Sequence, residues 1–491
     1  MNLADLVHAS AGRFPQRRAV TDAGTGQSLT YADLDQEIER VRTFLLRVGV
    51  APGQRIGLLA PNAVAYLPAA FGLLAAGACL VPIAANLTPT EVRKIASEVQ
   101  VNGCLAWPEA GPVVGGSDRH TLAGGTCDGF TFEWLARGLE GPAALRRLNP
   151  AFIRFTSGTT ADRKGVVLSH EATAARVDAA DRVLRLTEED RILWVLPLAY
   201  HFAVTIVAYV RAGAHILLAA DTLPATIVDS IRRLRASVLY ASPLHFERMS
   251  TLSSMGPLAG VRVALSTSAP ISPAVMQRFE SVYGVPVGQA YGIIEAGLPC
   301  INRGCDGLSP RSVGRAVPGY EVAAFSDTGA RLPAGASGEI GVRGDGLFAA
   351  YYAPWRLRED LTRDGWLLTG DIGRLDDTGA LYLEGRKKAV IFVAGLKFFP
   401  EEVEECINEV PGVKESRVFA TPHPHLGQVP RAEVAFATPT PDLDAVRAHC
   451  ARALSPYKVP VEFIAVESTA KTAGGKILRR PGAASVPAER A

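Results

Sequence analysis

One short stretch, residues 155–166, constrains the fold more than any other part of the chain. It reads F-T-S-G-T-T-A-D-R-K-G-V, between apolar runs at 151–155 and 166–168 that are typical of strands. Such a loop can direct backbone N–H groups, hydroxyls and one ammonium at a phosphate chain, although ordinary hairpin turns have a similar composition. It fits no G-x-x-x-x-G-K-[ST] frame and is therefore not a Walker loop. The candidate phosphate ligands are Thr156, Ser157, Gly158, Thr159, Thr160 and Lys164.

Length and charge restrict the rest of the molecule. A chain of 491 residues exceeds one ordinary core, so we expect a large body with several lobes and one smaller domain. The hydrophobic share of 48% is typical of a globular protein. A formal net charge of +2 gives no signal for nucleic acid or an anionic membrane. A negatively charged substrate must therefore meet a local cluster of charges.

Cysteine spacing and hydropathy suggest the compartment. The seven cysteines are scattered and form no C-x-x-C pair, which favours reduced thiols. The beginning of the chain lacks the basic and apolar regions of a signal peptide, and no apolar run reaches the length of about 18 residues that a membrane helix needs. We therefore expect a cytoplasmic protein with no membrane span.

Apolar periodicity predicts an α/β fold. Strand 55–60, helix 66–77 and strand 79–83 form a β-α-β unit with a parallel sheet, and strands alternate with helices again over 191–283. Residues 111–129 read as a surface loop, and 204–212 as a helix. Short strands with frequent turns over 312–383 suggest a β-barrel-like subdomain. The predicted parts are a large N-terminal domain (1–384) of stacked α/β subdomains plus that subdomain, a hinge (385–388) and a small mobile α+β C-terminal domain (389–491).

Four further features suggest nucleotide chemistry. In the run 289–295, Tyr291 can stack on a planar base and Glu295 can hold a hard cation such as Mg²⁺. Asp371 can accept two ribose hydroxyls, and Arg386 can clamp ribose or phosphate. The run 471–476 projects Lys476 from a backbone with two glycines. Each motif alone has a high false-positive rate, but their occurrence together in this order is far more specific.

With these features, the chain resembles the AMP-forming adenylating superfamily, which contains acyl-CoA synthetases, adenylation domains of peptide synthetases and beetle luciferases. The resemblance extends from Leu29 to Arg479. It implies that a small C-terminal domain re-orients on a large N-terminal domain between two half-reactions. It also implies ATP or AMP, Mg²⁺ and coenzyme A as cofactors, and a carboxylic acid or its acyl-adenylate as the other substrate. A homodimer is compatible with it.

The resemblance assigns roles to matching positions. Residues 156–164 would cradle pyrophosphate, and Thr160 would help Glu295 to ligate Mg²⁺. Asp371 would hold the ribose and Arg386 ribose or phosphate, while Lys476 would bridge the acyl carboxylate and the α-phosphate. The residues expected around the adenine and along the nucleotide are Ser268, Ala269, Pro270, Ala290, Tyr291, Gly292, Ile293 and Ile294. The residues expected at the hinge and on the coenzyme A side are Lys388, Ala394 and Gly395.

The same resemblance narrows the acid. Tyr200 or His201 lies where the family carries a gating residue at the mouth of the acyl tunnel, although His201 could instead only cap a helix. The stretch 196–203 has no aspartate to pair a substrate ammonium, which argues against an amino acid. The expected pocket residues are Tyr200, Val204, Ile293, Gly297 and Leu298. Their apolar character favours a fatty, aromatic or polycyclic acid, and coenzyme A is the expected acceptor because 338–366 lacks the insertion typical of carrier-protein ligases.

Four positions depart from the family pattern, and one of them is Ala470, which stands where the lysine loop usually begins with proline. Ala161 and Arg163 replace the usual glycine and proline of the loop, and Ile294 replaces a threonine that would donate to the α-phosphate. Losing that donor could cost about 1.5–3 kcal/mol of the contact. Two alternatives to a complete ligase therefore stay open. The protein could transfer the acyl group of a preformed acyl-AMP to coenzyme A without adenylating, or it could be a catalytically silent acyl-nucleotide binding protein.

Overall fold

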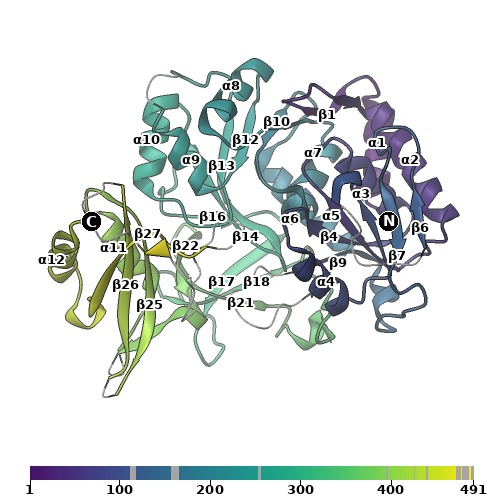
Figure 1. The fold of residues 1–491 in the computed structure, drawn as a ribbon. Helices are drawn as coiled ribbons and strands as arrows, with labels where there is room; N and C mark the ends of the chain where they lie inside the picture. Colours follow the sequence, from purple (N-terminus) through teal and green to yellow (C-terminus); the bar gives the residue numbers. More distant parts are fainter. Residues whose placement is uncertain are drawn as a thin grey trace. The chain divides into compact units, whose positions relative to one another are not determined.

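The protein is known from a computed structural model that describes residues 1–110, 118–155, 165–252, 256–393, 396–424, 426–437, 441–471, 477 and 486–487. The described residues form two compact units. Unit 1 contains 1–155, 165–322 and 342–367, and unit 2 contains 323–341 and the residues from 368 onward. Figure 1 shows the elements of both units, each of which is described by itself.

Unit 1 begins with a nine-stranded sheet in the order β20-β19-β9-β8-β4-β3-β5-β7-β6. Strand β3 pairs in parallel with β4 and β5, and β8 pairs in parallel with β4 and antiparallel with β9. Its strands are β3 (Arg55–Ala60), β4 (Cys79–Ala84), β5 (Gly103–Ala106), β6 (Arg119–Thr121), β7 (Thr131–Trp134), β8 (Pro150–Phe155), β9 (Gly165–Ser169), β19 (Ala350–Tyr351) and β20 (Arg356–Leu357). Successive residues of β8 face opposite sides of the sheet, and Ile153 packs into the core with Val81 and Val167.

The second sheet of unit 1 has parallel strands at its centre. Strands β14, β13, β12, β10, β11 and β1 are consecutive and parallel, and antiparallel β15 and β16 follow β14. The strands are β1 (Arg18–Asp22), β2 (Ser28–Thr30), β10 (Arg191–Trp194), β11 (His215–Leu218), β12 (Val238–Ala241), β13 (Val263–Ser266), β14 (Val287–Ile293), β15 (Gly297–Asn302) and β16 (Gly314–Ala316). This order places the carboxyl ends of β10, β12, β13 and β14 side by side.

Several helices of unit 1 begin at residues whose side chains cap them. Thr30 and Thr88 form capping boxes with Asp33 and Glu91, and Ser169 accepts a hydrogen bond from the Ala172 amide. The helices are α1 (Ala4–Arg13), α2 (Tyr31–Arg47), α3 (Tyr66–Ala75), α4 (Pro89–Glu98), α5 (His170–Leu184), α6 (Leu198–His201), α7 (Val207–Arg211), α8 (Pro224–Leu234), α9 (Pro243–Met249) and α10 (Pro273–Tyr283). Three 3₁₀ turns also occur at Pro108–Ala110, Leu145–Leu148 and Arg358–Asp360.

Unit 2 contains two groups of strands. The first group follows the order β17-β18-β21-β22. The first residues of β17 and β21 and the last residues of β18 belong to unit 1. In the second group, β26 pairs with β23, β25 and β27 and carries α11 and α12 on one face (Figure 1). The elements are β17 (Tyr320–Phe325), β18 (Gly338–Gly344), β21 (Leu367–Leu375), β22 (Ala380–Arg386), η5 (Lys387–Ala389), β23 (Ile391–Val393), β24 (Leu396–Phe398), α11 (Pro400–Asn408), β25 (Val413–His423), β26 (Gly427–Phe436), α12 (Leu443–Ala453), η6 (Pro456–Lys458), β27 (Glu462–Ser468) and β28 (Val486–Pro487).

The α/β class and the alternation of elements are confirmed, with three differences. Strand β6 lies inside the segment 111–129, so the prediction of a continuous loop there is wrong at 119–121. The predicted helix 204–212 begins as a π-helix over Phe202–Ile206 and becomes α7 at Val207. Strand β19 pairs with β9, and β20 pairs with β19, so both belong to the nine-stranded sheet rather than to the group of the other short strands of 312–383. The boundaries 1–384, 385–388 and 389–491 stay a prediction.

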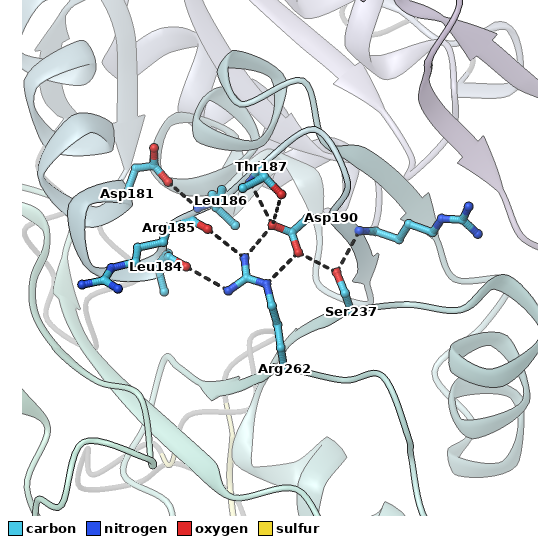
Figure 2. A network of polar contacts seen from close by, with 9 residues as sticks. Asp181, Leu184, Arg185, Leu186, Thr187, Asp190, Ser237 and Arg262 are labelled. Atoms are coloured by element: carbon cyan, nitrogen blue, oxygen red, sulfur yellow. Dashed lines mark hydrogen bonds and ion pairs between the residues drawn. The ribbon is translucent and has the colours of Figure 1, made fainter.

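A polar network fixes the amino ends of the parallel strands in the second sheet (Figure 2). Asp190, Ser237 and Arg262 stand directly before β10, β12 and β13. The Arg262 guanidinium donates to both carboxylate oxygens of Asp190, at 2.8 and 2.5 Å, and to the carbonyls of Leu184 and Arg185 at 3.1 Å. Ser237 also donates to Asp190, at 2.7 Å. One bidentate ion pair thus ties the end of α5 to three neighbouring strands.

Candidate active site

The predicted site residues of unit 1 cluster at the opposite, carboxyl edge of the same parallel strands. Tyr200 and His201 follow β10, Ser268 follows β13, and Glu295 follows β14. Ser266 of β13 pairs with Gln289 of β14, so the loops that continue from these two strands are neighbours. The carboxyl edge of a parallel sheet is the usual place for a ligand site in α/β proteins.

The expected adenine side consists of the loop after β13 and the end of β14. Tyr291 is buried, and Gly292 lies at an irregularity in the pairing of β14 with β15. A Cβ added at Gly292 would lie 2.8 Å from the carbonyl oxygen of Gly297 and from the side chain of Leu298, so only glycine fits. Ser268 has a positive φ of 77°, which is strained for a residue with a side chain. Ala269 and Pro270 are exposed, Ala290 is buried, and Ile293 and Ile294 are half-buried.

Glu295 occupies the turn between β14 and β15, and hydrogen bonds hold both its backbone and its carboxylate. Its carbonyl oxygen accepts from the Phe348 amide at 2.7 Å, and its Oε1 accepts from the Tyr351 hydroxyl at 2.9 Å. Burial and the nearby Glu295 carboxylate raise the pKa of Tyr351, so this hydroxyl is a proton donor at neutral pH. The carboxylate therefore has a fixed direction.

A buried arginine that the sequence reasoning missed also holds this turn. Arg176 of α5 donates to the carbonyl oxygens of Ile294 and Glu295, at 3.0 and 3.2 Å. It also donates to the Gly346 carbonyl, at 3.0 Å from Nε and 2.5 Å from Nη2. Burial lowers the pKa of Arg176, an effect opposed by the nearby Tyr320 and Glu295. An arginine at helical spacing from Thr173, Val177 and Ala180 was the available signal, because those residues form the buried face of α5.

Aromatic rings surround the expected gate of the acyl pocket. The His201 ring contacts Trp194 and Tyr240, with centroid distances of 5.7 and 6.0 Å, and Trp194 stacks on Tyr240 at 5.7 Å. His201 therefore packs into an aromatic cluster rather than only ending α6. Within the described residues, the buried indole N–H of Trp194 has no hydrogen-bond partner. Gly297 and Leu298 lie against Gly292, whereas Val204 is on the separate π-helical segment.

A second buried arginine, also missed, lies beside this gate. Arg154 is the fifth residue of β8 and is 6% exposed. Its guanidinium donates to the Tyr200 carbonyl, and burial lowers its pKa to about 10. Tyr66, Tyr200 and Glu295 are close enough to shift that pKa back upward. A charged residue inside the apolar run 151–155 was the signal in the sequence.

Two predicted ribose ligands meet in unit 2. Asp371 of β21 pairs with Arg386 of β22, and the Arg386 Nε lies 2.7 Å from Asp371 Oδ1. Directly beside them, Glu339 accepts hydrogen bonds from the Gly370 amide at 3.2 Å and from Lys387 Nζ at 2.8 Å. Asp371 is buried, while the Arg386 side chain is 53% exposed. The guanidinium can therefore reach a ligand while it stays paired.

Several predicted residues cannot be placed. The loop residues Thr156, Ser157, Gly158, Thr159, Thr160, Ala161, Arg163 and Lys164 lie outside the described residues, as do Ala394, Gly395 and Lys476. Lys388 belongs to the short turn η5, and its side chain is also outside the described part. Their roles stay predictions.

The described residues suit Mg²⁺ that is bound by one carboxylate together with substrate phosphates. Across the described ranges, no group of three or more His, Cys, Asp or Glu side chains could hold a metal ion. Mg²⁺ is often bound through one or two carboxylates together with substrate phosphates and water. A single oriented carboxylate such as Glu295 suits that mode. In the described part of the chain, no helix is both long and apolar enough to cross a bilayer.

Comparison with protein families gives two matches. The family model described as AMP-binding enzyme matches residues 7–352. The model described as AMP-binding enzyme C-terminal domain matches residues 402–476. The first match includes the turn at Glu295, whereas Asp371 and Arg386 lie in the sequence between the two matched ranges.

Individual proteins are similar along nearly their whole length. The chain is 29% identical over 494 residues to a sulfoacetate–CoA ligase from Cupriavidus necator, covering 97% of this chain and 96% of that protein. It is 28% identical over 490 residues to the long-chain-fatty-acid–CoA ligase FadD13 from Mycobacterium tuberculosis, covering 97% of each. The solved structure of ATP-bound MatB from Rhodopseudomonas palustris superposes with a TM-score of 0.82 at 24% identity, covering 97% of both chains. That likeness shows the fold.

Proposed function

Because the chain belongs to the AMP-binding enzyme family, as the match over residues 7–352 shows, we propose that it is an AMP-forming acid–thiol ligase. It would convert a carboxylic acid, ATP and coenzyme A to acyl-CoA, AMP and pyrophosphate through an acyl-AMP intermediate. The observation that supports this proposal is that Glu295 and Ser268 follow adjacent parallel strands, at the edge of the sheet where α/β proteins usually bind a ligand.

The reaction would have two steps. In the first, a carboxylate oxygen attacks the α-phosphorus of ATP and the bond to pyrophosphate breaks. In the second, the coenzyme A thiol attacks the acyl carbon, loses its proton, and AMP leaves. Mg²⁺, held by Glu295 and the phosphates, would supply charge stabilisation when bound. Within this chain, Tyr291 would pack against the adenine, Asp371 and Arg386 would hold the ribose, and Lys476 would orient the attacking carboxylate.

The substrate we favour is a hydrophobic carboxylic acid. The cluster of Trp194, His201 and Tyr240 supports an apolar acyl chain or ring beside the gate. The similarity to FadD13, named as a long-chain-fatty-acid–CoA ligase, is consistent with this class.

A second substrate class has its own support. Arg154 brings a buried positive charge beside Tyr200, and the buried Tyr66 hydroxyl near it has no hydrogen-bond partner in the described residues. Buried polar groups normally have partners. An acid with a second anionic group, as in the sulfoacetate of the relative from Cupriavidus necator, would provide them.

The test is a pair of assays on the intact protein. Acid-dependent ATP–pyrophosphate exchange would be measured over fatty, aromatic and polycyclic acids and their sulfonated or dicarboxylic analogues. Thioester formation would be measured from coenzyme A and synthetic acyl-adenylates. Exchange supports the complete ligase, and its dependence on the acid selects the substrate class. Arg154→Met should remove a preference for anionic analogues but leave a preference for hydrophobic acids unchanged.

Two other outcomes correspond to the alternatives. Thioester formation without exchange for any acid would support a thiolation-only enzyme, which the missing hydroxyl at Ile294 favours. Silence in both assays would favour a binding protein. Lys476→Ala should lower exchange about a hundredfold or more, the size expected when one charge-stabilising group is lost. Unchanged exchange in this variant would remove Lys476 from the proposed mechanism.

A further inference from the structure

Arg176 is an unusual residue for the middle of a helix in a protein core. It lies in α5 and is 2% exposed. A buried guanidinium is unfavourable unless its donors are satisfied. In the described part of the chain, its acceptors are backbone carbonyls: Gly346, Ile294 and Glu295. The side chain therefore links α5 to two segments that are distant in sequence.

One of those segments contains Glu295, and the other donates hydrogen bonds to it. The turn 294–296 carries its backbone, and the Tyr320 hydroxyl adds a hydrogen bond to the Ala296 carbonyl at 2.5 Å. The segment that begins at Gly346 supplies the Phe348 amide, which donates to the Glu295 carbonyl, and the Tyr351 hydroxyl, which donates to its carboxylate. One guanidinium thus fixes the turn and the segment that orients the turn's carboxylate.

The backbone packs closely against the arginine at two glycines. Gly297 has a φ of +80°, and an added Cβ there would lie 3.0 Å from Arg176 Cδ. A Cβ added at Gly346 would lie 2.8 Å from Arg176 Cβ and 2.0 Å from the Tyr320 hydroxyl. Two glycines therefore let the backbone approach the arginine closely enough for its short hydrogen bonds.

We propose that Arg176 is a positioning residue for Glu295, and that it sets the affinity of the site for the divalent cation that accompanies the nucleotide. The proposal rests on the proposed function, because it takes Glu295 as the cation ligand. Arg176 does not contact the cation. It acts by fixing the backbone from which the ligand projects, in the way that residues behind a metal ligand typically change metal affinity by about 10–100-fold.

The experiment compares matched arginine variants. Arg176→Met removes the donors and nearly keeps the volume, and Arg176→Lys keeps one donor group and the charge. Arg55→Met is the control, because Arg55 is also 2% exposed and donates to two backbone carbonyls, Gln100 at 2.9 Å and Leu139 at 3.0 Å. The binding of Mn²⁺ in the presence of a non-hydrolysable ATP analogue would be followed by electron paramagnetic resonance. The dependence of exchange on free Mg²⁺ would be measured in parallel.

The expected result is a rise of about tenfold or more in the cation concentration for half-saturation in Arg176→Met. Arg176→Lys should show a smaller rise, and Arg55→Met none, although both methionine variants lose stability. Equal half-saturation in wild type, Arg176→Met and Arg55→Met would show that Arg176 is only structural. If Arg176→Met does not fold, Arg176→Lys decides by the same comparison.

The two proposals can fail separately. If the wild-type protein catalyses neither exchange nor thioester formation, the proposed function fails. The Mn²⁺ titration with the ATP analogue still measures the effect of Arg176, since it requires no turnover. Normal exchange in wild type with an unchanged cation dependence in both Arg176 variants would overturn the inference alone.

Discussion

The two edges of the parallel sheet in unit 1 use arginine side chains differently: Arg262 at the amino edge is partly exposed, and Arg176 at the carboxyl edge is buried. At the amino edge, Arg262 forms a bidentate ion pair with Asp190, and Ser237 and Thr187 also donate hydrogen bonds to this carboxylate (Figure 2). At the carboxyl edge, Arg176 bonds backbone carbonyls, and the nearby carboxylate of Glu295 receives its hydrogen bond from Tyr351 instead. A guanidinium group therefore neutralises a carboxylate at the amino edge, whereas at the carboxyl edge it holds the backbone from which a carboxylate projects.

The difference teaches how stability and function separate on one sheet. A carboxylate whose oxygens are both held by a guanidinium is unsuited to bind a cation. A carboxylate that is oriented by a tyrosine, with the guanidinium bound to the backbone behind it, stays suited to that purpose. We therefore expect changes at the amino edge to alter stability and changes at the carboxyl edge to alter cation-dependent activity.

The largest expected effect is at the carboxyl edge. Glu295→Gln keeps the size of the side chain and an acceptor for Tyr351 but removes the charge. ATP–pyrophosphate exchange should fall about 10²–10³-fold, because a charge-stabilising element is lost. The urea-unfolding free energy should change by less than about 1 kcal/mol, as for most substitutions outside a core. Loss of stability with normal exchange would contradict the distinction between the two edges.

Arg262→Met is the corresponding change at the amino edge. It leaves the buried Asp190 without its ion-pair partner, and we expect a loss of about 2–4 kcal/mol in unfolding free energy, below the full value for a buried pair because Arg262 is partly exposed. Exchange per folded molecule should be unchanged. Arg42→Met, which breaks an exposed pair with Glu39, is the control and should cost about 0.5 kcal/mol or less.

The effect of Arg262→Met should also depend on pH. Burial raises the pKa of Asp190, but the hydrogen bonds from Arg262, Ser237 and Thr187 outweigh it and lower that pKa below 3.8 in the folded protein. The wild-type contribution is therefore full above the unfolded pKa and is lost as the pH falls through the folded pKa. In the variant, burial is opposed only by the hydrogen bonds from Ser237 and Thr187, so the pKa of Asp190 would lie higher than in wild type. The stability difference should therefore shrink below about pH 4, by about 1.4 kcal/mol per unit of pKa. A difference independent of pH between 7 and 3 would exclude Asp190 as its source.

The smallest expected effect is a difference in Mg²⁺ dependence between phenylalanine variants of two neighbouring tyrosines, Tyr351 and Tyr352. Tyr351→Phe removes the donor to Glu295 and should raise the Mg²⁺ concentration for half-maximal exchange about threefold to tenfold, since one hydrogen bond to a charged group is lost. Tyr352→Phe is the matched control, because its hydroxyl donates to Gln100 at 3.0 Å. Equal Mg²⁺ dependence in the two variants would mean that Tyr351 does not orient the carboxylate.

Local patterns predicted much of this fold. Strands 55–60 and 79–83 and helix 66–77 follow from apolar periodicity, because each buries one contiguous surface. Strand β6 was missed because three polar residues, Arg119–Thr121, join an edge through backbone pairing with β7, which requires no apolar pattern. Glu295 was accessible because the run 289–295 is one of several nucleotide-binding motifs that occur together in this order.

The contacts that hold the site residues in place could not be predicted from local sequence patterns. The contacts of Arg176 reach carbonyls 118 and 170 residues away in the chain, and any residue can supply a carbonyl. The pairing of Asp371 with Arg386 depends on the register between β21 and β22, which local patterns do not fix once a bulge intervenes. Sequence thus named the groups that would face a ligand, while the residues that hold them became visible only in three dimensions.

Because of the π-helix at Phe202–Ile206, the number of residues in this segment determines which side chains face the aromatic cluster. A π turn contains one residue more than an α turn, so deleting a residue here would restore α-helical spacing. Each residue turns an α-helix by about 100°, and such a deletion would rotate α7 relative to Tyr200 and His201 by that amount. The loss of a single codon could therefore exchange the side chains that face the aromatic cluster, with no substitution at all.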